Sequence, residues 1–103
     1  MNKKFREAYG KSFVIFREAS LGRVAALTQR LSLLICPDGG IMHLAAALAA
    51  PTLTLFFGTD PAVWHPPVDS SRYLQASGGP RALLPETVIE EARRLLQQGV
   101  KVP

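Results

Sequence analysis

The sequence contains one cysteine, few aromatic residues and no long apolar segment. Cys36 is the only cysteine among 103 residues, so no internal disulfide can form. A single thiol with no evident cluster of cysteine and histidine ligands argues against a structural zinc site. The longest apolar helical stretch, 41–50, contains His43 and falls well short of the ~20 residues that cross a bilayer. The charged N-terminus lacks the apolar core of a signal peptide. We therefore expect a cytoplasmic protein without a membrane span, a metal site or a cofactor.

Basic residues outnumber acidic residues modestly and are unevenly placed. The chain has 12 lysines and arginines against 8 aspartates and glutamates, for a net charge of +4. Several basic residues crowd the first eleven positions: Lys3, Lys4, Arg6 and Lys11. The cluster matches no signature of a nucleic-acid-binding fold. We interpret it as the solvated face of a helix and expect no nucleic-acid partner.

Segments of strand and helix length alternate along the chain, which is long enough for one domain. The expected strands are 13–16, 32–36, 52–57 and, less strongly specified, 72–76. The expected helices are 3–9, one that follows Ser20, 40–49, a short one from Pro61 and a last one from about Pro85. The central strands are apolar throughout, which is typical of parallel strands buried on both faces. The sequence therefore predicts an α/β fold with a parallel sheet and helices on both faces.

Helical spacing also predicts which side chains are buried. On the helix 40–49, the expected apolar face consists of Ile41, Leu44, Ala45 and Leu48. On the last helix, the expected buried stripe consists of Val88, Ala92, Leu95 and Leu96. Glu90 and Arg94 are expected to form an i,i+4 pair on the exposed side of that helix.

A glycine-containing loop joins the apolar strand ending at Cys36 to the helix rich in alanine and leucine. This glycine loop consists of Asp38, Gly39 and Gly40, which precede the helix. The unpaired amides of a helix N-terminus and its dipole favour an anion such as phosphate. A simpler interpretation is that Asp38 caps the helix and the glycines only form the turn. A second polar loop, Gly58 to Asp60, follows the next strand and is expected at the same sheet edge, where such sheets bind ligands.

His43 is a candidate ligand-binding residue because it lies in the first turn of the helix, nearly opposite the expected apolar face. The helix dipole disfavours a positive charge there, so a neutral imidazole could form a hydrogen bond. The alternative is a partly buried histidine that packs beside the loop. His65 lies in a rigid turn and is expected to be exposed and without function, while Trp64 is expected to pack the short helix.

Several motifs in order resemble the C-terminal portion of glycosyltransferase family nine, the ADP-heptose:lipopolysaccharide heptosyltransferases. They are Ser20-Leu21, the segment 38–48, Pro51 and the segment 57–61. The resemblance runs from about Phe13 to Pro67. It implies a GT-B architecture, in which two Rossmann-like domains face each other across a cleft. Residues 1–103 would form one partial nucleotide-sugar-binding domain.

The resemblance also implies a binding site for an ADP-heptose-like nucleotide diphosphate sugar. Asp38, Gly40 and His43 would line this site, and Thr59 and Asp60 would lie near the diphosphate. The amides of Gly39 and Gly40 suit phosphate oxygens on physical grounds as well. The chain departs from the family at Gly39, where serine or threonine is usual, and lacks the proline common between glycine and threonine of the second loop.

The acceptor-binding N-terminal domain and its acidic general base have no counterpart in this sequence. We therefore expect a fragment or a truncated gene product, without turnover alone and without an assigned catalytic residue. The missing domain is the expected protein partner, and a peripheral membrane contact of the intact enzyme in lipopolysaccharide or glycan biosynthesis stays open. One alternative is a nucleotide-sugar 2-epimerase-like domain, although the glutamate typical of those helices is absent between Met42 and Ala47. Another is a non-catalytic module that binds a nucleotide or a protein.

Overall fold

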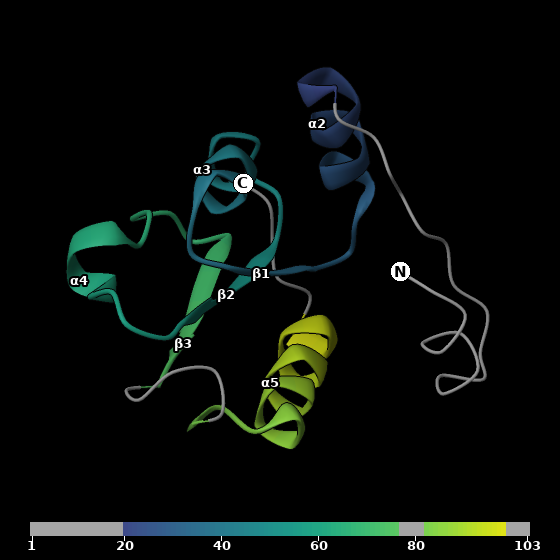
Figure 1. Ribbon diagram of the computed structural model, residues 1–103. Coiled ribbons are helices and arrows are strands. Elements are labelled where there is room, and N and C mark those ends of the chain that lie inside the picture. The colour runs from purple at the N-terminus through teal and green to yellow at the C-terminus, as the bar shows by residue number, and fades with distance from the viewer. Residues whose placement is uncertain (1–19, 77–81, 99–103) are drawn as a thin grey trace, which may run out of the picture.

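The computed structural model describes residues 20–76 and 82–98 (Figure 1). The elements in chain order are α2 (Leu21–Arg30), β1 (Leu34–Pro37), α3 (Gly40–Ala47), β2 (Thr52–Phe56), α4 (Pro61–Trp64), β3 (Ser71–Gln75) and α5 (Pro85–Gln98). The predicted helix 3–9, strand 13–16 and loop 77–80 lie outside the described residues. Within them, strands and helices alternate as the sequence predicts.

The three described strands form one parallel sheet in the order β1-β2-β3. Leu34 lies opposite Thr52, and Thr52 lies opposite Ser71, so β2 is paired on both edges. Helix α3 connects β1 to β2 and the short helix α4 lies in the connection from β2 to β3, as parallel pairing requires a crossover. The predicted α/β fold is confirmed.

Helices cover both faces of the sheet, and the side chains of β2 alternate between them. Leu53 is fully buried against Leu95 of α5, on one face. Phe56 is fully buried with Met42 of α3 and with Cys36 of β1, on the other. Figure 1 shows α3 and α5 on opposite sides of the strands. The core is therefore split into two layers by a central strand that contributes to both.

Cys36 packs in the α3 layer as a small buried residue. Its side chain is 5% exposed and its sulfur lies 4.0 Å from the hydroxyl of Thr54. Burial raises the pKa of the Cys36 thiol, the negative charge of Asp38 acts in the same direction, and the contact with Thr54 opposes them. The neutral thiol is the favoured form, so a packing role is confirmed.

The predicted buried faces of two helices are partly wrong. On α3, Met42 and Ala45 are buried, whereas Ile41 is 37% exposed. On α5, Leu95 is buried, whereas Leu96 is 49% exposed. The helix wheel could not choose between faces of α3 because that helix is apolar all round, and adjacent residues on α5 point about 100° apart.

Two local predictions also differ from the structure. Arg94 pairs with Glu91, three residues earlier, and not with Glu90. Helix α3 ends at Ala47, two residues before the predicted end, because Ala49 adopts a left-handed conformation with φ 55°. This turn leads the chain into Pro51, just before β2, and the residue before a proline disfavours helical backbone.

The burial of neighbouring leucines on α5 can be tested by substitution. We expect Leu95→Ala to lower the free energy of unfolding by about 2–5 kcal/mol, because it opens a cavity against Leu53. Leu96→Ala is the matched control and should change it by about 0.5 kcal/mol or less, because that side chain is half exposed. Urea denaturation of both variants measures the difference, and equal losses would contradict the assigned face.

Candidate functional site

The two polar loops meet at the carboxyl-terminal edge of β1 and β2. The hydroxyl of Thr59 donates a hydrogen bond of 2.6 Å to Oδ2 of Asp38, which lies 21 positions earlier. Parallel pairing of Pro37 with Leu55 ends both strands at this edge, so the following loops emerge side by side. The predicted convergence of the loops is confirmed.

Gly39 gives the first loop a backbone conformation that is available almost only to glycine. Its φ of 149° and ψ of −165° fall in a region that side chains disfavour. Gly40 then begins α3, and the amide of His43 bonds the carbonyl of Gly39 at 3.4 Å. The amides of the preceding turn have no acceptor inside the helix. Apart from chain neighbours and the backbone of α3 itself, no described atom would lie within 4 Å of a side-chain Cβ at either position, so the loop is open on that side.

A cavity of about 340 Å³ lies against this loop. Its lining consists of Asp38, Gly39, Gly40, Met42, His43, Thr59 and Trp64. Five of the six predicted site residues therefore line one cavity. Asp60 does not line it, because its carboxylate accepts a hydrogen bond of 3.0 Å from the amide of Ala62 and caps α4.

His43 is exposed on the first turn of α3 and lines this cavity. The alternative of a partly buried histidine that packs beside the loop is therefore contradicted. The imidazole can instead reach a ligand that occupies the cavity, next to the amides of the same helical turn.

Trp64 is a cavity residue that the sequence reasoning missed. Its indole is 54% exposed, so the prediction that it packs the short helix is wrong. The missed signal is positional: the only tryptophan of the chain ends a one-turn helix that leads directly out of the second loop.

His65, the next residue, is also not the exposed histidine that the sequence suggested. Its ring is partly buried, and Nε2 lies 3.0 Å from the hydroxyl of Ser71. The ring packs against Tyr73 with centroids 4.7 Å apart and meets Phe56 edge-on at 6.2 Å. Burial lowers the pKa of His65, and the charge of Arg72 adds to this effect, while a hydrogen bond to the Ser71 backbone opposes it.

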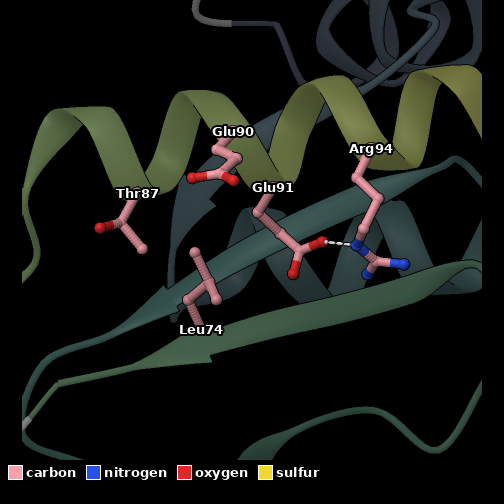
Figure 2. Close-up of a pocket in the computed structure, with 5 residues that line it drawn as sticks. All are labelled: Leu74, Thr87, Glu90, Glu91 and Arg94. Carbon is pink, nitrogen blue, oxygen red and sulfur yellow. Dashed lines mark hydrogen bonds and ion pairs between the residues drawn. The ribbon is translucent and has the colours of Figure 1, made fainter.

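A second cavity, of about 210 Å³, lies between β3 and α5 (Figure 2). Leu74 and Thr87 form part of its wall, and Glu90, Glu91 and Arg94 supply the charged groups. Arg94 is paired with Glu91, and Glu90 adds a further carboxylate. These charges make the cavity unsuited to an anionic ligand, in contrast to the glycine loop.

The described part of the chain has neither a cluster of metal ligands nor a helix suited to crossing a membrane. Residues 20–76 and 82–98 contain no group of three or more histidine, cysteine, aspartate or glutamate side chains that could hold a metal ion. Among the same residues, no helix has the length and apolar character needed to cross a membrane.

The parallel sheet with helices on both faces, and a glycine loop leading into a helix at its carboxyl edge, define an α/β domain of the Rossmann-like kind. The family model described as glycosyltransferase family 9 (heptosyltransferase) matches residues 3–81, and the chain belongs to that family. Membership implies binding of a nucleotide-sugar donor. No curated protein and no solved structure matches the chain.

The conformation of Gly39 predicts a contrast between the two glycines of the loop. We expect Gly39→Ala to lower the free energy of unfolding by about 1–3 kcal/mol, because alanine is strained at that φ and ψ. Gly40→Ala, the matched control, should leave it unchanged or raise it by up to about 1 kcal/mol, because helical backbone suits alanine. Space for the added methyl group does not differ between the two sites. Chemical denaturation measures both variants, and an equal loss of unfolding free energy would contradict the backbone explanation.

The lowered pKa of His65 predicts a pH dependence of stability. Below the ordinary value of 6.5, the unfolded chain binds a proton more readily than the folded chain, so stability is lost as the pH falls. We expect the unfolding free energy to decrease between about pH 7.5 and pH 5.5, and to decrease less in His65→Gln. Urea denaturation across this range measures both slopes. An identical slope in the variant would assign the dependence to other groups.

Proposed function

We propose that this chain forms the nucleotide-sugar-binding part of a GT-B glycosyltransferase. The enzyme would transfer a heptose-like sugar from an ADP-type donor during assembly of lipopolysaccharide or a related glycan. The observation that carries the proposal is the cavity between the glycine loop and Trp64, which lies within the region matched by the family.

In this proposal, the glycine loop holds the diphosphate of the donor. The first-turn amides of α3 supply hydrogen-bond donors and the positive end of the helix dipole. His43 adds an imidazole N–H at the same cavity wall. Asp38 would repel a phosphate, but its Oδ2 is engaged by the Thr59 hydroxyl. We therefore assign Asp38 to loop positioning or to a sugar hydroxyl.

The hydrogen bonds of the second loop limit what its polar residues can offer to a ligand. The Thr59 hydroxyl donates its hydrogen to Asp38, so it can serve a ligand only as an acceptor. The Asp60 carboxylate is committed to the Ala62 amide and sits outside the cavity lining. In the proposed site, Asp60 thus orders α4 and leaves diphosphate binding to the first loop.

Trp64 is proposed to stack on the nucleotide base. Its exposed indole lines the cavity opposite the α3 wall, which carries His43. Stacking of a base on an aromatic side chain stabilises binding by about 1–3 kcal/mol. The cavity volume also lies within the roughly 300–1,000 Å³ typical of small-molecule sites.

The acceptor and the general base are proposed to come from a second domain that faces this cavity. Among the described residues that line the cavity, Asp38 is the only acidic one, and its carboxylate accepts a hydrogen bond from Thr59. In the transfer, the bond between the sugar and the diphosphate breaks and a bond to the acceptor hydroxyl forms. The hydroxyl proton would pass to the base of the second domain, so we expect no turnover by this chain alone.

The proposal predicts a direct fluorescence response, because Trp64 is the only tryptophan. Titration with ADP should change the indole emission saturably, and UDP and GDP should act more weakly. A preference for UDP would favour the epimerase-like alternative. The donor site would be overturned if the folded protein showed no change in fluorescence with any of the three nucleotides and no heat of binding in calorimetry.

His43→Ala should weaken ADP binding about tenfold, because a hydrogen bond to a charged phosphate is lost. Its melting temperature should hardly change, because His43 is exposed. Ala47→Gln, also on the exposed side of α3 but outside the cavity lining, is the control and should bind ADP as the unmodified chain does. Equal affinity in the His43 variant would remove this residue from the site.

A further inference from the structure

Helix α4 carries Trp64 but is weakly anchored by its own apolar side chains. It is a single turn, Pro61–Trp64, in which Val63 is 68% exposed and Trp64 is 54% exposed. A helix of one turn has no stability of its own in water. What holds α4 in place must therefore act at its two ends.

The N-terminal end of α4 is held by a cap and by burial. Asp60 accepts a hydrogen bond from the amide of Ala62, and the ring of Pro61 is buried. Through Thr59 and its bond to Asp38, the residues just before this end are also tied to the glycine loop. These contacts fix where α4 begins but not where its last residue points.

The C-terminal end of α4 is held by His65. The backbone amide of this residue bonds the carbonyl of Pro61 at 2.9 Å and closes the turn. Its ring reaches β3, where Nε2 lies 3.0 Å from the Ser71 hydroxyl and the ring plane is tilted against Tyr73. Phe56 of β2 contacts the same ring edge-on. His65 thus joins the end of α4 to two strands of the sheet.

We infer that His65 is a positioning residue, which holds the Trp64 indole against the cavity by tying the end of α4 to Ser71 and Tyr73. The use of this placement, which is stacking on the nucleotide base, rests on the proposed function. Trp64 and His65 are joined by one planar peptide, so fixing the ring of His65 restricts the backbone of Trp64. Loss of the anchor frees the indole and removes a preorganised stacking surface.

The decisive measurement is made on the full chain without nucleotide. We expect His65→Ala to lower the fluorescence anisotropy of Trp64 and to raise its quenching by acrylamide, at temperatures where circular dichroism shows a folded protein. The matched control is Val63→Ala on the same turn, which should leave both signals unchanged because its side chain is exposed. In His65→Ala, the dissociation constant for ADP should rise about fivefold, the equivalent of one lost aromatic contact.

Two milder variants keep the test valid if His65→Ala does not fold. Ser71→Ala removes the hydroxyl partner and leaves the ring contacts in place. His65→Gln keeps a polar side chain but removes the aromatic contacts with Tyr73 and Phe56. Each should free the indole to a smaller degree than alanine at position 65. Folded variants with the anisotropy and quenching of the unmodified chain would overturn the inference.

The two proposals fail in different ways. If the indole is freed in His65→Ala but the unmodified chain binds no nucleotide, the donor site is wrong and the anchor stands. If the unmodified chain binds ADP while the anisotropy, quenching and affinity of His65→Ala are all unchanged, the anchor is wrong and the donor site stands.

Discussion

Strands β1 and β2 run in the same direction, with Pro37 opposite Leu55, and this pairing brings the two polar loops to one edge of the sheet. The hydrogen bond from Thr59 to Asp38 then joins loops that lie 21 positions apart. The cavity depends on both features, because one wall comes from the first loop and α3, and the other from the second loop and α4. Burial of Leu53 and Phe56 on opposite faces keeps β2 in this register.

The two walls of the cavity are built on different physical supports. The first is supported by the core, since Met42 and Ala45 bury α3, and it begins at Gly39 in a conformation nearly restricted to glycine. The second is a single helical turn with an exposed indole, followed by His65, whose ring contacts Ser71 and Tyr73 of β3. Polar donors thus lie on the better supported wall, and the aromatic surface lies on the more weakly supported one.

The sequence was sufficient for features that depend on local chemistry. Apolar strands alternating with helices predicted the parallel sheet, and the glycine loop with the first turn of its helix predicted Asp38, Gly39, Gly40 and His43, which line the cavity; Thr59 was added by the family resemblance. The sequence was insufficient where the burial or the neighbours of a side chain depend on how distant elements pack together. The wheel of an apolar helix could not show that Ile41 is exposed. Nothing local to Trp64 or His65 indicated that their neighbours would be a distant loop and strand β3.

The separate anchoring of α4 has an evolutionary consequence. Replacements in a one-turn segment that is capped at one end and pinned at the other can alter the surface offered to a heterocycle without disturbing the peptide groups of the glycine loop. In the proposed donor site, selectivity for the base and binding of the phosphates can therefore change independently. In that proposal, substitutions that alter the preferred base would lie between the second loop and β3.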